Sequence, residues 1–226
     1  MRVKNEKCEG PFLSDREILM RMAHPEHGKR IIITPLISLQ HQLGGDSIDL
    51  RVGPEFVLTE RSEATCIDPA EMTCMEPQEI EKRYRRVLKI DPLDPFILHP
   101  EEQILCSTLE TVHIPYDLMA FLEGRSTWAK QGLGVHSHAG FIHAGSTGVI
   151  TLELINIGSV PFKLYTGTRI AQLSFSPLSS APLQRYSGKK AKYAGSINPD
   201  IGRPWEDYEY KLIKEGLDKK SSSKTT

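Results

Sequence analysis

Apolar and polar residues alternate along several short segments of the chain, which is the pattern of half-buried β strands. The segment from Ser47 to Val52 shows this alternation, and the pairs Gly44-Gly45 and Gly53-Pro54 bracket it as turns would. The same pattern recurs at short spacing in residues 104–114, 149–157, 162–165 and 170–175. Many short strands with little helix between them predict a mainly β fold, either a sandwich or a barrel.

Helical patterns are few and short. Ser14 can cap a helix, Glu17 lies three residues on, and apolar residues follow at helical spacing from Ile18, so a short amphipathic helix is expected there. The charged stretch from Met72 to Val87 is interpreted as a surface excursion between strands, partly helical, whose mixed charges are typical of a solvated face.

The length of 226 residues, with 39% hydrophobic residues, allows a substantial core, and no long Pro, Gly or Ser tract divides the chain. We therefore expect one domain over residues 1–217. Residues 218–226 contain no apolar side chain and are expected to form a disordered tail.

Charge and cysteine content indicate the cellular compartment and the kinds of partner that can be expected. The 28 basic and 29 acidic residues nearly cancel, so the chain as a whole has no electrostatic pull toward nucleic acid or a membrane surface. No apolar run approaches the roughly 20 residues that span a bilayer, and the N-terminus has no hydrophobic signal core. The four cysteines form no C-x-x-C pair, which is typical of reduced thiols. We expect a cytoplasmic protein without nucleic-acid or membrane partners.

Most of the candidate functional residues lie between Phe121 and Asn156. Arg125, Ser126 and Thr127 precede a short helical segment, and free backbone N–H groups at a helix N-terminus can bind an anion. The alternative is a capped turn in which the arginine makes a structural ion pair. Lys130 shares a helix face with Ser126, so a cation and a hydroxyl group could converge on one ligand, although a solvated lysine is the simpler interpretation.

Glu153 is a carboxylate among apolar neighbours. It shares one face of its predicted strand with Val149, Thr151 and Ile155. If this face is buried, desolvation favours the protonated carboxyl group, as in a general base tuned toward neutral pH. The alternative is a glutamate on the solvated face of a sheet.

Three histidines, His136, His138 and His143, lie close enough in sequence to suggest a metal site, with the first two on one face of a strand. The H-x-E and P-C-x-x-C pattern of zinc deaminases is missing, so ordinary hydrogen-bonded histidines and no zinc are expected. Further on, the basic segment Gly188–Gly195 follows Tyr186. It could close over phosphates, or it is a soluble loop.

In this order the segments resemble the dCTP deaminase family, part of the dCTP deaminase and dUTPase superfamily. The resemblance runs from Phe12 to about Trp205 and rests on FLSDREI, GGDSIDLRVG, FILHPEEQILCSTLETVHIP, LEGRSTWAKQGLGVH, GVITLELINIG, IAQLSFSPLS and KKAKYAGS. It implies a distorted β-barrel resembling a jelly roll, as in dUTPases, assembled as a homotrimer with active sites between subunits. It also implies zinc-independent hydrolysis of dCTP to dUTP and ammonia, supplying dUTP for dUMP and dTTP synthesis, with Mg²⁺ bound through the triphosphate.

The resemblance also assigns roles at the reacting end of the nucleotide. Glu153 matches the general base and proton shuttle that activates water for attack on C4 of the cytosine ring. Ser126 matches the hydroxyl group that helps to hold that water. Arg125, Ser126 and Thr127 together match the phosphate-binding turn.

Further positions match residues that bind the rest of the nucleotide. Thr151 and the neighbouring backbone of Leu152 fall where the family reads the base edge. Tyr186 and Lys192 match residues of the C-terminal segment that reach the triphosphate.

Four positions differ from the family pattern. Lys130 takes the place and the catalytic role of an arginine, although it lacks the planar fork that orients a water and a carbonyl group together. His143 replaces an aspartate that contacts the sugar and, in dUTPases, helps to activate the water that attacks phosphorus. Ser146 stands where a bulky residue is usual, and Ser196 where a glutamine often closes over the phosphates.

Three hypotheses follow. The first is a dCTP deaminase, the second a dUTP diphosphatase or bifunctional enzyme, and the third a nucleotide-binding homologue that has lost turnover. The expected ligand is dCTP, with dUTP and dTTP as further candidates.

Overall fold

The computed structural model describes residues 10–59, 66–184, 186 and 191–222, and these residues form two compact units. The first unit comprises the described residues up to Phe56 together with Lys89–Asp200. The second comprises those of Val57–Leu88 together with those from Ile201 on. The single domain expected over residues 1–217 stays a prediction.

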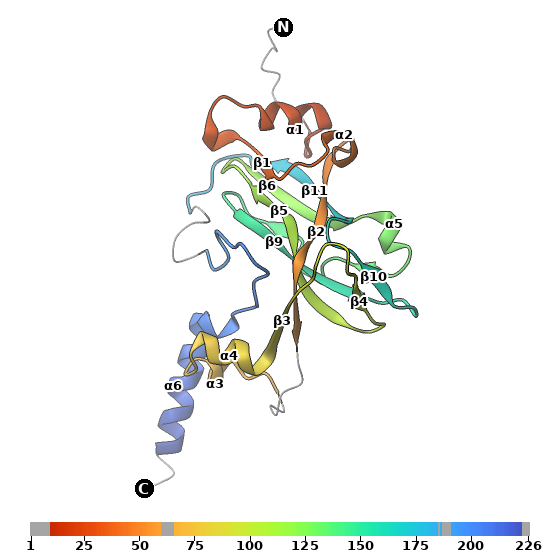
Figure 1. Ribbon diagram of the computed structural model, residues 1–226. Coiled ribbons are helices and arrows are strands. Elements are labelled where there is room, and N and C mark those ends of the chain that lie inside the picture. Colours follow the sequence, from red (N-terminus) through yellow and green to blue (C-terminus); the bar gives the residue numbers. More distant parts are fainter. Residues whose placement is uncertain (1–9, 60–65, 185, 187–190, 223–226) are drawn as a thin grey trace. The chain divides into compact units, whose positions relative to one another are not determined.

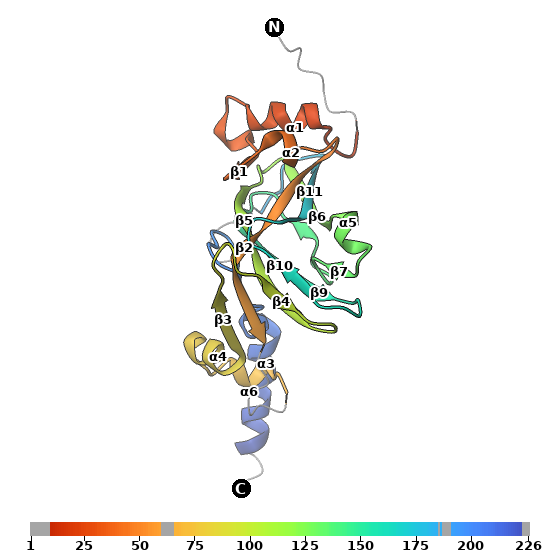
Figure 2. The same cartoon turned by 45° about the vertical axis from the view of Figure 1, so that its right-hand side comes forward.

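A curled β sheet dominates the first unit (Figure 1, Figure 2). Its strand order is β7-β9-β5-β2-β11-β6-β8, with β1 paired to β5, while β10 and β4 form a separate pair. The strands are β1 (Ile32–Thr34), β2 (Ser47–Thr59), β3 (Arg85–Lys89), β4 (Phe96–Leu98), β5 (Gln103–His113), β6 (Leu118–Gly124), β7 (Leu133–Gly134), β8 (Phe141–Ile142), β9 (Thr147–Asn156), β10 (Phe162–Leu164) and β11 (Arg169–Pro177). The predicted mainly β fold is confirmed.

Short helices surround this sheet. In the first unit they are α1 (Asp15–Met22), the 3-10 helix η1 (His27–Lys29), α2 (Leu39–Gln42) and α5 (Ser126–Ala129). The predicted capping box of α1 is present, because the Ser14 hydroxyl oxygen accepts a hydrogen bond from the Glu17 backbone N–H and the Glu17 carboxylate accepts one from the Ser14 backbone N–H.

The alternation of apolar and polar residues along the strands determines which side chains form the core of the first unit. On β9, Ile150, Leu152 and Leu154 are buried, while the opposite face is half-buried. Phe56 and Phe96 stack with their ring centroids 4.6 Å apart. Other fully buried apolar side chains come from β2, β5, β6 and β11 and include Ile48, Leu50, Ile104, Leu122, Leu173 and Phe175.

Strand β2 is longer than predicted, because Gly53-Pro54 does not end it. A Cβ atom on Gly53 would lie 2.7 Å from the Ser107 hydroxyl oxygen, so the glycine allows two strands to approach closely. The Pro54 carbonyl oxygen accepts a hydrogen bond from the Ile90 backbone N–H. These residues therefore continue the strand where the sequence suggested a turn.

The second unit is mostly helical. Besides the last residues of β2 and all of β3 except Lys89, it contains α3 (Pro69–Met72), α4 (Pro77–Tyr84), the 3-10 helix η3 (Pro204–Glu206) and α6 (Tyr208–Ser222). Met72 and Ile80 form a small buried cluster against which Met75 and Trp205 pack. The stretch from Met72 to Val87 is thus partly helical, as predicted, and α6 includes the first five residues of the segment expected to be a tail.

None of the helices in the described part of the chain has the length and apolar character needed to cross a membrane.

Candidate functional site

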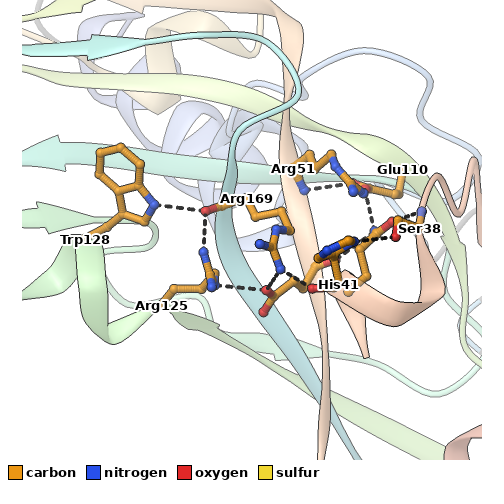
Figure 3. Close-up of polar contacts among 9 residues, drawn as sticks. Ser38, His41, Arg51, Glu110, Arg125, Trp128 and Arg169 are labelled. Carbon is orange, nitrogen blue, oxygen red and sulfur yellow. Dashed lines mark hydrogen bonds and ion pairs between the residues drawn. The ribbon is translucent and has the colours of Figure 1, made fainter. Parts of the chain in front are cut away.

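A cavity of about 500 Å³ opens in the first unit beside β2 and β11. Its walls come from the α2 turn, from β2, from α5 and its cap, and from the turn that enters β11. The lining residues are Ser38, His41, Arg51, Arg125, Thr127, Trp128, Gly167, Thr168 and Arg169. Three of these residues are arginines, whose guanidinium groups can bind an anion through planar, multidentate contacts, and Figure 3 shows the polar contacts around them.

Asp49 balances part of this positive charge. One carboxylate oxygen, Oδ2, lies 2.9 Å from Arg125 Nε and 3.0 Å from Arg169 Nη1. Burial raises the pKa of Asp49 above its usual value, although both arginines act in the opposite direction. Two arginines therefore share one carboxylate and keep a net positive charge.

A β-bulge sets the position of Arg169. Leu50 on β2 faces Ala171 on β11, but Arg51 faces Arg169, so Ile170 is an extra residue in the ladder. The Arg169 carbonyl oxygen accepts hydrogen bonds from Arg125 Nη1 at 3.1 Å and from the Trp128 indole N–H at 2.9 Å. The bulge thereby ties α5 to the wall of the cavity (Figure 3).

A buried polar network lies behind Arg51. Glu110 is fully buried on β5, and its oxygens accept hydrogen bonds from the Arg51 backbone N–H at 2.9 Å and from Arg51 Nη1 at 3.1 Å. Gln42 Nε2 donates to Glu110 Oε1 at 3.0 Å and to the Asp49 carbonyl oxygen at 3.0 Å. In the α2 turn, the Ser38 hydroxyl lies 2.8 Å from His41 Nδ1, and the His41 carbonyl oxygen accepts from Arg169 Nη1.

The predicted anion turn differs in one respect from the expectation. Helix α5 is a single turn capped by Arg125, so few peptide dipoles align in it. Arg125 and Thr127 line the cavity, Ser126 and Thr127 are exposed, and Lys130 is an exposed cap residue. The structural ion pair that was the alternative for Arg125 is present, and the charge of the cavity comes from arginine side chains.

Glu153 lies on the half-buried face of β9. Its carboxylate oxygen Oε2 accepts a hydrogen bond from the Ser137 backbone N–H at 2.8 Å, and its own N–H donates to the Val135 carbonyl oxygen at 3.0 Å. The neighbouring strand β7 pairs with the end of β9, and α5 packs against β7. The structure thus links Glu153 to the 125–127 turn through β7 and the residues that follow it.

Residues 195–200 lie along the first half of β9. The Gly195 N–H donates to the Thr147 carbonyl oxygen at 2.6 Å, and the Val149 N–H donates to the Ser196 carbonyl oxygen at 2.9 Å. The Asp200 N–H donates to the Thr151 hydroxyl oxygen at 2.9 Å. The Ser196 hydroxyl group donates to the Asp200 carboxylate, so it stabilises this segment itself.

The remaining predicted residues occupy different settings. Leu152 is fully buried on the opposite face of β9, so only its backbone faces the site. The exposed ring of His143 lies 5.2 Å from the ring of Tyr186. Lys192 is half-buried, while residues 188–190 of the basic segment lie outside the described residues.

The predicted placement of His136 and His138 on a strand is wrong, because both lie in irregular backbone after β7. His136 Nε2 is 3.6 Å from a Glu123 carboxylate oxygen, and His138 is exposed. Within residues 10–59, 66–184, 186 and 191–222, no three His, Cys, Asp or Glu side chains gather as a metal site.

Sequence reasoning missed most of the cavity. Asp49 and Arg51 were the polar positions of an alternating strand, a pattern that equally describes solvent-facing residues. Their partners Arg169 and Glu110 lie 120 and 59 residues away along the chain. The one local signal was the presence of opposite charges on β2 at alternating positions.

Comparisons with known proteins match this architecture. A sequence model of the dCTP deaminase-like family matches residues 12–178. A relative named "dCTP deaminase, dUMP-forming" from Dictyoglomus thermophilum is 39% identical over 85% of this chain and 94% of its own length. A relative named "dCTP deaminase" from Halorubrum lacusprofundi is 34% identical over 88% of this chain and 94% of its own length.

A solved structure shares the fold. The crystal structure of 2'-deoxycytidine 5'-triphosphate deaminase from Agrobacterium tumefaciens superposes with a TM-score of 0.56 at 18% identity over 74% of this chain. This chain spans about half the length of that protein, 48%. The resemblance inferred from the motifs is therefore confirmed, and the chain belongs to the dCTP deaminase-like family.

Proposed function

We propose that this protein hydrolyses dCTP to dUTP and ammonia. The observation that carries the proposal is the Glu153 carboxylate, which accepts a hydrogen bond from the Ser137 N–H on the half-buried face of β9 in a chain of this family. A carboxylate fixed through one oxygen keeps the other available for proton transfer, and general bases of this kind contribute about 10²–10⁴-fold to rate.

In the proposed reaction a water molecule attacks C4 of the cytosine ring, and Glu153 takes the proton that the water loses. Glu153 passes this proton to N3 of the ring, then takes the proton of the new C4 hydroxyl group and delivers it to the exocyclic amine, so that the C4–N bond breaks, C4=O forms and ammonia leaves. Ser126 and Lys130 are proposed to hold the attacking water, and Thr151 with the Leu152 backbone to read the base edge. Because Glu153 begins and ends ionised, the cycle balances in protons.

The triphosphate is proposed to occupy the arginine-lined cavity. Arg125 and Thr127 line it, and the other guanidinium groups come from Arg51 and Arg169. Tyr186, Lys192 and Ser196 of the C-terminal segment, together with His143, are proposed to contact the sugar and phosphates.

The residues that line this cavity include no carboxylate, so Mg²⁺ is proposed to bind there only through the phosphates of the nucleotide. The carboxylate beside the cavity, Asp49, is shared by two arginines, and Mg²⁺ commonly binds through substrate phosphates with few protein ligands. When bound, it would neutralise phosphate charge. The expectation of no zinc stays a prediction.

The test follows ammonia, dUTP and pyrophosphate together after purified protein is mixed with dCTP and Mg²⁺. Glu153→Gln should abolish ammonia release and leave dCTP affinity within about tenfold, because the base is lost while the phosphate contacts remain. Glu209→Gln, which neutralises an exposed carboxylate on α6, is the control and should keep wild-type turnover. Normal turnover of the Glu153 variant would exclude Glu153 as the base.

A second candidate is a bifunctional enzyme that also releases pyrophosphate. Relatives at 36–39% identity carry the name "dCTP deaminase, dUMP-forming", and dUMP formation from dCTP requires loss of both ammonia and pyrophosphate. Pyrophosphate appearing with ammonia in the same assay supports this candidate. Nucleotide binding with neither product supports the homologue without turnover.

A homotrimer in the cytoplasm is also proposed, on the family resemblance. The half-buried face of β9 around Glu153 is consistent with a site completed by a neighbouring subunit.

A further inference from the structure

We propose that Glu110 is a positioning residue for phosphate binding, acting through Arg51 and through Gln42 of the α2 turn. The inference rests on the proposed function, since it takes the arginine-lined cavity as the place where the triphosphate binds. Glu110 itself does not line the cavity.

The two carboxylate oxygens of Glu110 accept hydrogen bonds from three donors. Oε2 accepts from the Arg51 backbone N–H, and Oε1 accepts from both Arg51 Nη1 and Gln42 Nε2. Arg51 is thus held at its backbone and at one guanidinium nitrogen, which fixes the direction in which the rest of the guanidinium points. Arg51 is one of the residues that line the cavity.

The same carboxylate also holds the neighbouring α2 turn. Gln42 donates from one nitrogen to Glu110 and to the Asp49 carbonyl oxygen, and its carbonyl oxygen accepts from the Ser38 N–H at 3.2 Å. Ser38 and His41 of this turn line the cavity. Glu110, which is 59 residues from Arg51 and 68 from Gln42 along the chain, therefore holds both Arg51 and the α2 turn in the cavity wall (Figure 3).

Stability alone does not account for this arrangement. Both partners of the pair are buried, with side chains 8% and 0% exposed. Replacing a buried ion pair by apolar residues of similar volume is often neutral or stabilising, because desolvation of two charges offsets their attraction. A role in orienting Arg51 toward an anion explains a charged pair at this position.

The test is a double-mutant cycle on ligand affinity, with inorganic tripolyphosphate as the probe and calorimetry as the measurement. The variants are Arg51→Met, Glu110→Met, Glu110→Gln and the double Arg51→Met/Glu110→Met. Arg51→Met should weaken binding about 10- to 100-fold, as expected for a lost charged contact. Glu110→Met and Glu110→Gln should also weaken it, by at least about fivefold, because Arg51 loses its fixed direction.

The decisive comparison is made without Arg51. The double variant should bind tripolyphosphate within about twofold of Arg51→Met, since Glu110 has no arginine left to orient. It should also fold even if Glu110→Met does not, because both buried charges are gone. Lys163→Met, which removes an exposed cation on β10 outside the cavity, should keep wild-type affinity.

Two results would overturn the inference. One is an additive loss of affinity in the double variant, and the other is wild-type affinity in Glu110→Gln. If the wild-type protein does not bind tripolyphosphate, the proposal that the cavity binds phosphate is wrong, and this inference is wrong with it. Deamination of dCTP and its dependence on Glu153 are measured separately and would stand.

Discussion

Single side chains in this protein take their properties from neighbours that are remote in sequence. Asp49 and Glu110 are both carboxylates whose pKa burial raises, and each is held by arginine. Strand alternation predicted only that Asp49 would lie on a polar face. It carried no information about burial or partners, since ion pairs across sheet strands depend on long-range pairing.

The effect of burial on the pKa of a single side chain can be tested at His113. Its ring nitrogen Nδ1 lies 2.7 Å from the Thr147 hydroxyl oxygen, and the His27 ring centroid is 6.3 Å away. Burial, and then the nearby His27, lower the pKa of His113 below 6.5. The unfolded chain therefore binds this proton more readily, and folding stability rises with pH between the folded pKa and 6.5.

We expect urea denaturation to show that the wild-type protein loses stability between pH 7 and pH 5. His113→Gln should lose less over this interval, because its side chain does not titrate. His138→Gln, at an exposed histidine, is the control and should follow the wild-type curve. Identical pH dependence of His113→Gln and the wild-type protein would contradict the assignment.

Among the structural elements, strand β9 was predicted best. The division of its side chains between two faces, with Glu153 on the face opposite Leu152, followed from period-two alternation alone, and the predicted segment 149–157 corresponds to Thr147–Asn156 in the structure. Burial of the Glu153 face was left open, and the structure gives it as half-buried. The segment 195–200 that pairs with β9 was not predicted, because its backbone hydrogen bonds need no characteristic side chains.

Gly148 allows that pairing. Its φ is +135°, and a Cβ atom there would lie 2.7 Å from the Ser196 carbonyl oxygen. Gly148→Ala should reduce the free energy of unfolding by about 1–3 kcal/mol and detach residues 195–200 from β9.

Chemical denaturation and limited trypsin digestion check this prediction, with faster cleavage after Lys192 as the expected sign of detachment. Gly28→Ala meets no atom within 4 Å and is the control. Unchanged stability and digestion of Gly148→Ala would show that the segment does not depend on close approach at this glycine.

For the molecule as a whole, the motifs predicted family and fold class better than they predicted the site. Hydrophobic patterning and the ordered motifs were sufficient for a mainly β member of the dCTP deaminase-like family. The cavity was missed because its charged residues come from β2, α5 and β11, which only the folded sheet brings together. The partly helical character of residues 72–87 was predicted, but helix α6 was not, since its last five residues belong to the segment that was expected to be a tail.

Assembly is the corresponding test at this level. If the active sites lie between subunits, the protein should scatter light with about three times the 25.4 kDa mass of one chain. Dilution that dissociates the trimer should reduce deamination in parallel. A fully active monomer would contradict the proposal, because each site would then be complete within one chain.

Because Ile170 is an extra residue in the ladder, the number of residues between Arg169 and Ala171 affects the geometry of the cavity. Substitution of the Ile170 side chain leaves the count of residues unchanged, so Arg169 keeps its place opposite Arg51. Deleting Ile170 would restore a regular ladder in which Arg169 still faces Arg51, but it would remove the bend and the added twist that the bulge gives β11. Members of a lineage that keep this cavity are thus expected to vary in composition here while conserving spacing.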